Sequence, residues 1–379
     1  MVTFFRSRLF SFILPFLFLH FQTTFGQQKK DYKVLSIAFY NLENLYDIYD
    51  DPATFDDDRT PQGKDRWTAE IYQKKIDNMA YAISRIGKEE IQEFPAVLGV
   101  CEIENRQVLE DLISNKNLAD ANYGIIHYDS PDLRGIDVAL LYKNDLFVPQ
   151  HSAVHELVLY DPKEAQKRLF TRDILVVSGL LDGEQISVIV NHWPSRSGGE
   201  KLSSPKREKA ALLNRQIIDS LQRKDPYAKI ISMGDFNDDP YNKSISKILG
   251  AKAQKELTGM RDMYNPMAAL SEKGIGSLAY ADGWNLFDQI MLSKPLLTKD
   301  FSSYSLYKAA VFNPQFLMTP TGQYKGYPFR SFGNGGFTNG YSDHFPVYIL
   351  LLKQLEGEPG TPRNPGQHED QSQSVENRK

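Results

Sequence analysis

An aspartate and a histidine lie side by side near the C-terminus, as Asp343 and His344, directly before the apolar residues 346–352. A carboxylate next to an imidazole can transfer protons or bind a metal ion. Successive side chains on a strand point to opposite faces, but the turn before a strand can direct both into one cleft. Because this dipeptide is common by chance, its chemistry depends on the other polar residues that the fold brings to it.

Similar polar residues stand at the ends of apolar runs elsewhere in the chain: Asn41, Glu102, His192, Asp235, Asn237 and Asp288. Each has a simpler explanation when taken alone, because an Asn or Asp after a strand commonly forms a turn with its own backbone. As a set, they and His344 combine carboxylates, amides and imidazoles. Hydrolysis of a phosphodiester requires such groups, as ligands for a hard divalent cation, as a base that acts on water, and as donors that stabilise the transferring phosphoryl group.

The predicted metal ligands are carboxylates. Mg²⁺ takes oxygen ligands and keeps several of its waters, so one or two carboxylates are enough to hold it, and we expect Glu102 and Asp343 to do so. The chain has neither the HExxH pattern of zinc proteases nor the GxSxG elbow of serine hydrolases, which disfavours both classes. Its one cysteine, Cys101, ends an apolar run without an evident activating partner, and we expect it to be buried.

Six short motifs together resemble the endonuclease/exonuclease/phosphatase superfamily, which includes pancreatic-type deoxyribonucleases, abasic-site endonucleases, sphingomyelinases and inositol-polyphosphate phosphatases. They occur in the order seen in that superfamily: FYNLEN at 39–44, CEIEN at 101–105, NHWP at 191–194, GDFND at 234–238, FDQI at 287–290 and SDH at 342–344. The resemblance extends over about residues 34–352. Any one of these motifs is weak evidence, whereas six in one order are strong evidence.

The resemblance implies a role for each residue at a matching position. Glu102 is expected to bind the divalent metal, with Asn41 and Asp343 close to the same ion. That ion is expected to be Mg²⁺, with Mn²⁺ or Ca²⁺ as alternatives. Asp235 is expected to orient or deprotonate the attacking water, and Asn237 to donate a hydrogen bond to the scissile phosphate.

The two histidines are expected to lie on opposite sides of the phosphate. The resemblance implies that His344 contacts the phosphate or transfers a proton, with Asp288 holding its imidazole in one tautomer. His192 resembles a histidine of the deoxyribonuclease branch, where a glutamate supports it. Here Asp129 occupies the loosely matching position, and the alternatives for this support are Asp132 and Asp137. A further departure is the disulfide of the deoxyribonucleases, which a chain with one cysteine cannot form.

Short apolar runs alternate with longer amphipathic segments between residues 31 and 353. The pattern predicts an α/β (α+β) fold, a four-layer sandwich of two packed mixed β-sheets with helices on the outer faces. Helical spacing of apolar residues predicts helices over 71–86 and 204–222, and a helix starting at 108–113. Strands are predicted at 34–40, 96–100, 137–142, 174–181, 186–190, 230–233, 287–292 and 346–352. Residues 311–340, rich in aromatics and glycines, are predicted to form a long ordered loop.

The two ends of the chain differ from this central domain, predicted to cover residues 31–353. Residues 1–26 combine Arg6 and Arg8 with an apolar run and small residues, which is typical of a cleaved signal peptide; the alternative is an uncleaved anchor helix. No later run is long and apolar enough to span a membrane. Residues 356–379 lack the apolar content of a folded segment and are predicted to be a disordered tail. We therefore expect an exported protein, periplasmic or secreted, with a monomer as the default state.

The predicted function is an exported, Mg²⁺-dependent phosphodiester hydrolase that acts on nucleic acid, DNA or RNA, as an endonuclease or exonuclease. The formal net charge of −4 argues only against avid, non-specific nucleic-acid binding. The main alternative uses the same residues on a lipid head group, as sphingomyelinases do, or on an inositol phosphate, because substrate is read by loops rather than by the scaffold. A non-catalytic binding protein is the remaining alternative, but no expected site residue is missing.

Overall fold

The computed structural model describes residues 30–355, apart from 165, 281 and 334. Residues Tyr32–Leu355 form one compact unit. The predicted signal peptide at 1–26 and the predicted disordered tail at 356–379 lie outside the described residues. None of the helices within the described ranges is both long and apolar enough to cross a membrane.

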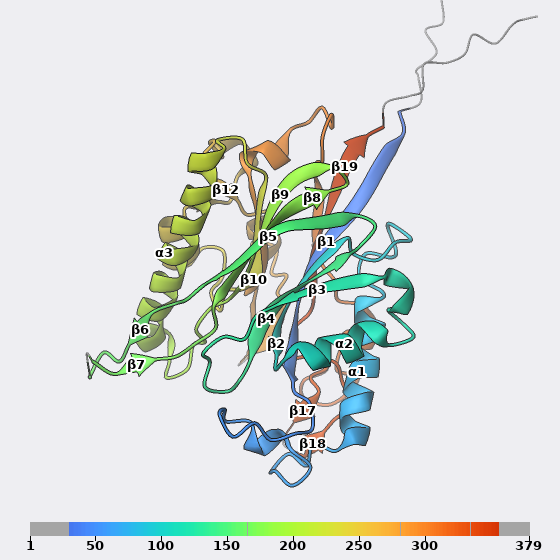
Figure 1. Cartoon of the computed structure of the whole chain (residues 1–379), viewed down its shortest axis with the longest axis vertical. Coiled ribbons are helices and arrows are strands. Elements are labelled where there is room, and N and C mark those ends of the chain that lie inside the picture. Colours follow the sequence, from blue (N-terminus) through green and yellow to red (C-terminus); the bar gives the residue numbers. More distant parts are fainter. Residues whose placement is uncertain (1–29, 165, 281, 334, 356–379) are drawn as a thin grey trace, which may run out of the picture. The chain divides into compact units, whose positions relative to one another are not determined.

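Two mixed β-sheets pack face to face in this unit (Figure 1). The six-stranded sheet has the order β16 (Ser305–Val311), β19 (Val347–Gln354), β1 (Tyr32–Leu45), β2 (Val97–Ile103), β4 (Asp137–Lys143) and β3 (Tyr123–His127). The seven-stranded sheet has the order β11 (Ala251–Lys252), β12 (Met263–Tyr264), β15 (Asp288–Ser293), β10 (Ile230–Asp235), β9 (Glu184–His192), β8 (Ile174–Leu181) and β5 (Phe147–His155). At the centre of each sheet one pair of strands is parallel, β1 with β2 and β9 with β10. The edge pair β11 and β12 of the seven-stranded sheet is also parallel, and the other neighbours in both sheets are antiparallel.

The central strands are buried on both faces, because one face meets the other sheet and the other face meets a helix. On β1, Ile37 and Phe39 belong to the core between the sheets, whereas Ala38 and Tyr40 pack toward the outer helices. This alternation follows from the two-residue period of a strand. Cys101 on β2 also lies fully buried in the core between the sheets.

The helices form the two outer layers. α1 (Ala69–Ile83) and α2 (Arg106–Ser114) bury apolar residues against the six-stranded sheet, and α3 (Glu200–Lys224) does so against the seven-stranded sheet (Figure 1). Thr68 and Asn105 start α1 and α2 as N-caps, since their side-chain oxygens accept from the backbone amides of Ile71 and Val108. The predicted four-layer sandwich is confirmed.

The remaining elements are short. Three two-stranded sheets lie in the loops: β6 (Leu159–Tyr160) with β7 (Arg168–Leu169), β13 (Leu278–Tyr280) with β14 (Gly283–Asn285), and β17 (Phe332–Gly333) with β18 (Gly336–Phe337). The short helical segments are Asp57–Arg59, Ala119–Ala121, Ser244–Leu249, Lys255–Leu257, α4 (Ala268–Ser271), Lys294–Leu297 and Gln315–Leu317. The predicted loop at 311–340 therefore contains a helical turn and a small hairpin of its own.

Candidate active site

Three predicted residues stand in one row across the seven-stranded sheet. Asp235, the last residue of β10, pairs with His192 at the end of β9 and with Asp288 at the start of β15. Residues directly opposite each other in neighbouring strands project from the same face of a sheet. The strand register alone therefore brings two carboxylates and an imidazole, which lie far apart in the sequence, to one edge.

Asn41 and Glu102 reach the same place from the six-stranded sheet. The register between β1 and β2 shifts after Asn41, and β2 bulges around Glu102, whose φ of 60° is left-handed. Such a bulge re-aims a side chain at the end of a strand. Asn41 Nδ2 donates to Glu102 Oε1 at 3.3 Å and to Asp235 Oδ2 at 3.1 Å, so this amide connects the two sheets.

The side-chain oxygen of Asn41 faces away from the other site residues. Asn41 Oδ1 accepts from the backbone amide of Glu43 at 2.9 Å. In this conformation Asn41 turns its side-chain nitrogen, and not its oxygen, toward the site residues. Its amide therefore positions Glu102 and Asp235. A reversed amide would lose three hydrogen bonds, which favours the orientation described.

His344 and Asp288 form a close pair. His344 Nδ1 lies 2.6 Å from Asp288 Oδ2, and Ser342 Oγ accepts from the backbone amide of His344 while donating to the carbonyl of Asn41. Burial by itself lowers the pKa of His344, but the carboxylates of Asp288 and Asp235 outweigh it and raise that pKa well above its ordinary value. The imidazole is therefore held in one orientation as a cation, with Nε2 directed toward Asp235.

Asp235 occupies the centre of the cluster. Its Oδ1 accepts from the backbone amide of Asn237, and its Oδ2 lies 3.7 Å from His192 Nε2 and 3.9 Å from His344 Nε2. Burial raises the pKa of Asp235 to about 6, and the charge of Asp288 adds to this effect. The carboxylate is still ionised at neutral pH and lies between both imidazoles.

His192 has a different environment. Its Nε2 is also 3.7 Å from Glu102 Oε1, while its buried Nδ1 has no hydrogen-bond partner within the described residues. Burial lowers the pKa of His192 well below its ordinary value, and the guanidinium groups of Arg172 and Arg134 lower it further. This histidine is therefore neutral.

The expected support of His192 by Asp129 is wrong in this structure. Asp129 is largely exposed and lies 3.9 Å from His127, where it lines a separate acidic pocket of about 280 Å³. The alternatives are engaged elsewhere as well, because Asp137 contacts His127 at 2.9 Å and Asp132 contacts Arg172 Nη1 at 3.2 Å. A loose match in a loop could not show which histidine the carboxylate would meet.

Asp343 lies at the rim of the site, with its side chain 37% exposed. Its Oδ2 accepts from Arg330 at 3.2 Å, and Arg330 also contacts the buried Glu43 at 3.4 Å. Desolvation raises the pKa of Asp343 to about 7, with the charges of Glu43 and Glu102 contributing. Sequence reasoning missed Arg330 and Glu43, although Arg330 lies in the loop predicted to be ordered.

Asn237 lies at the turn after β10, with a left-handed φ of 51°. Its Nδ2 donates to the carbonyl of Trp193 at 3.0 Å, so in this conformation the amide is anchored to the β9 loop rather than free for a phosphate. The preceding Gly234 packs so closely on Asn191 that a Cβ would lie 2.2 Å from the Asn191 carbonyl oxygen. This contact explains the need for glycine in the GDFN motif.

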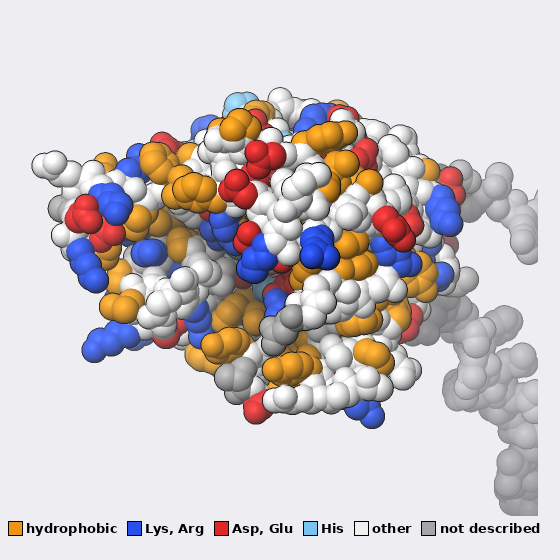
Figure 2. All heavy atoms as spheres, turned by 90° about the horizontal axis from the view of Figure 1, so that it is seen from below, with side chains coloured by type: hydrophobic (Ala, Val, Ile, Leu, Met, Phe, Trp, Pro, Cys, Tyr) orange, Lys and Arg blue, Asp and Glu red, His pale blue; other side chains and the backbone are white. Residues whose placement is uncertain are grey.

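The site opens on the lower end of the molecule. Figure 2 shows this face, with histidine atoms near its centre among basic, acidic and hydrophobic side chains.

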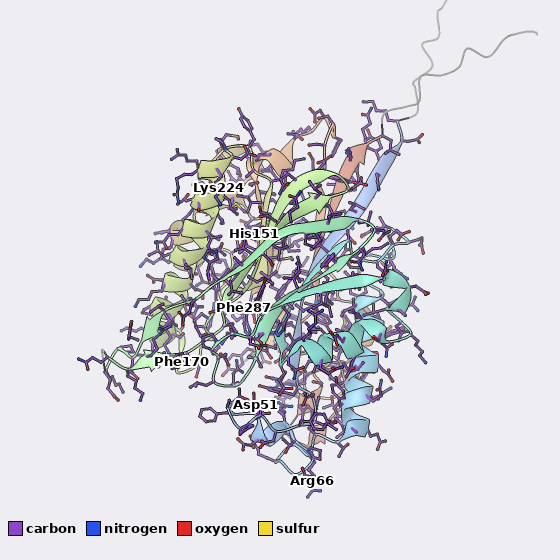
Figure 3. The ribbon with its side chains drawn as sticks, in the orientation of Figure 1. Asp51, Arg66, His151, Phe170, Lys224 and Phe287 are labelled. Atoms are coloured by element: carbon purple, nitrogen blue, oxygen red, sulfur yellow. The ribbon has the colours of Figure 1, made fainter. Side chains whose placement is uncertain are left out.

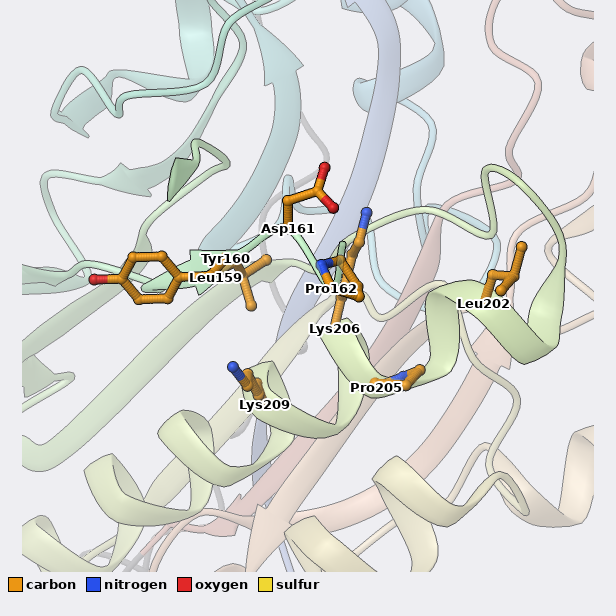
Figure 4. Close-up of a pocket in the computed structure, with 8 residues that line it drawn as sticks. All are labelled: Leu159, Tyr160, Asp161, Pro162, Leu202, Pro205, Lys206 and Lys209. Carbon is orange, nitrogen blue, oxygen red and sulfur yellow. The ribbon is translucent and has the colours of Figure 1, made fainter. Parts of the chain in front are cut away.

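Two other features lie outside the site. Figure 3 shows His151 on β5, away from Phe287, the residue before Asp288. Figure 4 shows a separate pocket of about 300 Å³, between β6 and the first turns of α3, that contains no predicted site residue.

The donor set fits a hard divalent cation. Four carboxylates, of Glu102, Asp235, Asp288 and Asp343, meet here, and donor atoms of Asp235, Asp288 and His344 lie within 4.8 Å of one another. Oxygen ligands predominate, which matches Mg²⁺ rather than a thiolate-bound metal. Of the predicted ligands, Glu102 and Asp343 keep exposed carboxylate surface that a cation could approach.

Comparisons with known proteins bear on the family and the fold of the chain. A model of the endonuclease/exonuclease/phosphatase family matches residues 36–353. The solved structure of a humanized D. rerio TDP2 is 13% identical, with coverage of 84% of this chain and 98% of that one and a TM-score of 0.50. A truncated Caenorhabditis elegans TDP2 is 14% identical, with coverage of 84% and 97% and a TM-score of 0.50.

A Bacteroides thetaiotaomicron mannosyl-6-phosphatase is 16% identical, with coverage of 84% of this chain and 99% of that one and a TM-score of 0.48. A search of curated protein sequences found no match. At such identities the two TDP2 structures show a shared fold and leave the substrate open. The family model, however, spans most of the chain and contains every predicted site residue. The chain therefore belongs to the endonuclease/exonuclease/phosphatase family.

Proposed function

We propose that the protein is an exported, Mg²⁺-dependent phosphodiester hydrolase that acts on nucleic acid. The observation that carries this proposal is the arrangement around Asp235, whose Oδ2 lies within 4 Å of His192 Nε2 and His344 Nε2. A phosphate bound there would meet an imidazolium on one side and a neutral imidazole on the other. Such an arrangement can supply both a base for water and donors for the developing charge.

Each side chain has a distinct part in this reaction. Asp235 accepts the proton of the attacking water, because it is ionised at neutral pH and held by the amide of Asn237. His344 donates from Nε2 to the leaving oxygen of the phosphate and gives it this proton as the P–O bond breaks, since Asp288 occupies its Nδ1. His192 binds another phosphate oxygen as a neutral donor, and Asn41 keeps Glu102 and Asp235 in register across the two sheets.

Glu102 would hold the cation, with Asp343 as a second carboxylate ligand. When bound, the cation would neutralise charge on the phosphate and so lower the barrier to attack. Arg330 contacts Asp343 and therefore sets its position before any cation binds. The crowding of carboxylates in the cluster favours cation binding, because a bound cation offsets the repulsion between their negative charges.

The proposal is tested by incubating the purified protein with supercoiled plasmid, sphingomyelin, an inositol phosphate and mannose 6-phosphate, each with Mg²⁺ or with EDTA. Nicking or degradation of DNA that requires Mg²⁺ is expected. Cleavage of the lipid or of a phosphomonoester without any effect on nucleic acid would show that nucleic acid is the wrong substrate class. Inactivity on every substrate in Mg²⁺, Mn²⁺ and Ca²⁺ would contradict a catalytic role altogether.

The metal ligand is tested with Glu102→Gln, which keeps the size of the side chain and removes its charge. We expect the variant to need a higher Mg²⁺ concentration for half-maximal activity and to bind Mg²⁺ more weakly by calorimetry. Glu110→Gln is the matched control, because this half-exposed carboxylate on α2 pairs with Arg106 on the same helix. An unchanged Mg²⁺ requirement in the Glu102 variant would remove Glu102 from the metal site.

A further inference from the structure

A row of partly exposed aromatic side chains begins on Phe345, the residue after His344. Trp284 on β14 stacks over Phe345, with the ring centroids 6.1 Å apart and the planes inclined by 17°. Phe345 is buried and directly follows His344 in the chain. The Trp284 indole, 41% exposed as a residue, therefore packs on the residue that follows the catalytic histidine in the chain.

Two tyrosines of the long loop continue the row. The ring of Tyr327 lies 5.5 Å from Trp284, and the ring of Tyr324 lies 5.9 Å from Tyr327. Tyr327 is held in place because its hydroxyl donates to Asp282 Oδ1 at 2.9 Å. Tyr324 is 58% exposed, so the row passes from the site outward into solvent.

The hairpin that carries Trp284 is tied to the catalytic residues through its backbone. Ser277, just before β13, accepts from the amide of Phe345 at 2.7 Å through its carbonyl. The Ser277 hydroxyl accepts from the amide of Asp288 at 3.3 Å. The hairpin that carries Trp284 is thus tied to the segments that carry His344 and Asp288.

We infer that Trp284, Tyr327 and Tyr324 bind successive bases of a single-stranded nucleic acid on one side of the scissile phosphate. This inference rests on the proposed function and names its substrate form. Three rings at successive separations of 5.5 and 5.9 Å extend beyond any one sugar or head group. Base stacking on aromatic side chains tolerates any sequence, and it requires bases that are not paired in a duplex.

The inclinations of the rings and a nearby charge support the same ligand. The planes of Trp284 and Tyr327 differ by 67°, and those of Tyr327 and Tyr324 by 41°, so the row suits separately tilted bases rather than a rigid stack. One exposed cation, Lys325, directly follows Tyr324 in the chain and can contact a phosphate between these bases. A neutral sugar does not need this cation.

The test compares two oligomers of equal length, oligothymidylate and a chain of abasic tetrahydrofuran phosphates, which share the backbone and differ only in the bases. In Trp284→Ala, the ratio of kcat/KM for thymidylate to kcat/KM for the abasic chain should fall by about 5- to 150-fold, corresponding to the loss of about one stacked base. Trp284→Phe should keep most of the ratio, and Tyr324→Ala should lower it less. Binding of labelled oligothymidylate in EDTA should weaken in parallel, because stacking does not depend on turnover.

The control is Tyr227→Ala, a 73% exposed tyrosine after α3, beside the start of β10 and so at the end of that strand opposite Asp235. It should leave the ratio unchanged. An equal loss on both oligomers in Trp284→Ala would overturn the inference, because the indole would then act only by supporting Phe345 and His344. An unchanged ratio would also overturn it while leaving nucleic-acid hydrolysis intact. If the wild-type protein cleaves neither oligomer but hydrolyses a sugar phosphate, the proposed substrate class and the inference fail together.

Discussion

The two histidines of the site share one carboxylate and differ in what stands behind them. Both present Nε2 to Asp235, at 3.7 Å for His192 and 3.9 Å for His344. Behind His344, Asp288 accepts from Nδ1 at 2.6 Å, whereas the Nδ1 of His192 is buried without a partner in the described residues. The same residue type is therefore a cation on one side of the site and a neutral donor on the other.

The difference arises from the neighbouring strands. Asp288 starts β15 in register with Asp235, so a carboxylate is built into the sheet beside His344. On the other side Asp132 is paired with the buried Arg172, which also donates to the Trp193 carbonyl, next to His192. The tautomer and charge of an imidazole are set by the group that contacts its far nitrogen. Proton transfer is therefore assigned to the His344 half and neutral binding to the His192 half.

The largest expected effect is on the His344 half. His344→Ala should lower kcat on DNA by about 10²–10⁴-fold, the usual contribution of a group that transfers a proton. His344→Gln should not restore activity, because an amide cannot exchange the proton. Circular dichroism and the unfolding midpoint check that the fold is intact. Plasmid nicking at the wild-type rate by the alanine variant would remove His344 from the chemistry.

The next effect is on stability in the His192 half. Arg172→Met should lower the free energy of unfolding by about 3 kcal/mol, because the buried Asp132 carboxylate loses its buried partner and keeps the half-exposed Arg134 at 3.7 Å. The double variant Arg172→Met with Asp132→Asn should recover part of that loss. Urea titration measures both. If the single variant is as stable as the wild type, the ion pair does not contribute to the free energy of unfolding, and another group holds the loop beside His192.

A smaller effect separates a neutral donor from an acid. His192→Ala should lower kcat by about 10²–10³-fold, as expected for loss of one hydrogen bond to the transition state. His192→Gln should recover at least a tenth of the wild-type rate, because its amide nitrogen can replace Nε2 as a donor. Equal inactivity of the two variants, with wild-type folding, would argue that His192 exchanges a proton after all.

The smallest effect is on the pH dependence of stability, measured in EDTA between pH 5 and 9. The raised pKa of folded His344 stabilises the fold below the ordinary value of 6.5, and this stabilisation is lost as the pH rises toward the folded pKa. The lowered pKa of His192 acts in the opposite sense, because stability is lost as the pH falls below 6.5. His344→Gln should therefore flatten the alkaline side of the profile and His192→Gln the acidic side. Changes on the same side in both variants would contradict the difference between the two histidines.

Much of the fold and of the candidate site was predictable from local patterns. Short apolar runs predicted β1 and β9, and helical spacing of apolar residues predicted α1 and α3, because these signals depend only on the local residue pattern of each element. The six motifs indicated the residues that meet at the site, since each stands at the end of such an element. The structure brings Asn41, Glu102, His192, Asp235, Asp288 and His344 together, as expected.

The wrong or missing assignments concern loops and side-chain orientation. Asp129 was placed beside His192 from a loose loop match, and it lies beside His127. Asn41 and Asn237 point their amides at other protein groups, which their residue type does not reveal. Arg330 contacts Asp343 from a loop whose path follows from contacts far apart in the sequence. Loops follow the packing beneath them, so their local sequence predicts little of this.

The sequence by itself determined which residue types stand at the strand ends, and with them the family and its phosphate chemistry. The tertiary structure alone decided how these residues divide the work. The register of β15 against β10 puts a carboxylate behind His344, and the Asp132–Arg172 pair leaves none for His192. The physical reason is that the charge of a buried group depends on its neighbours in space, which only the packing of the two sheets brings together.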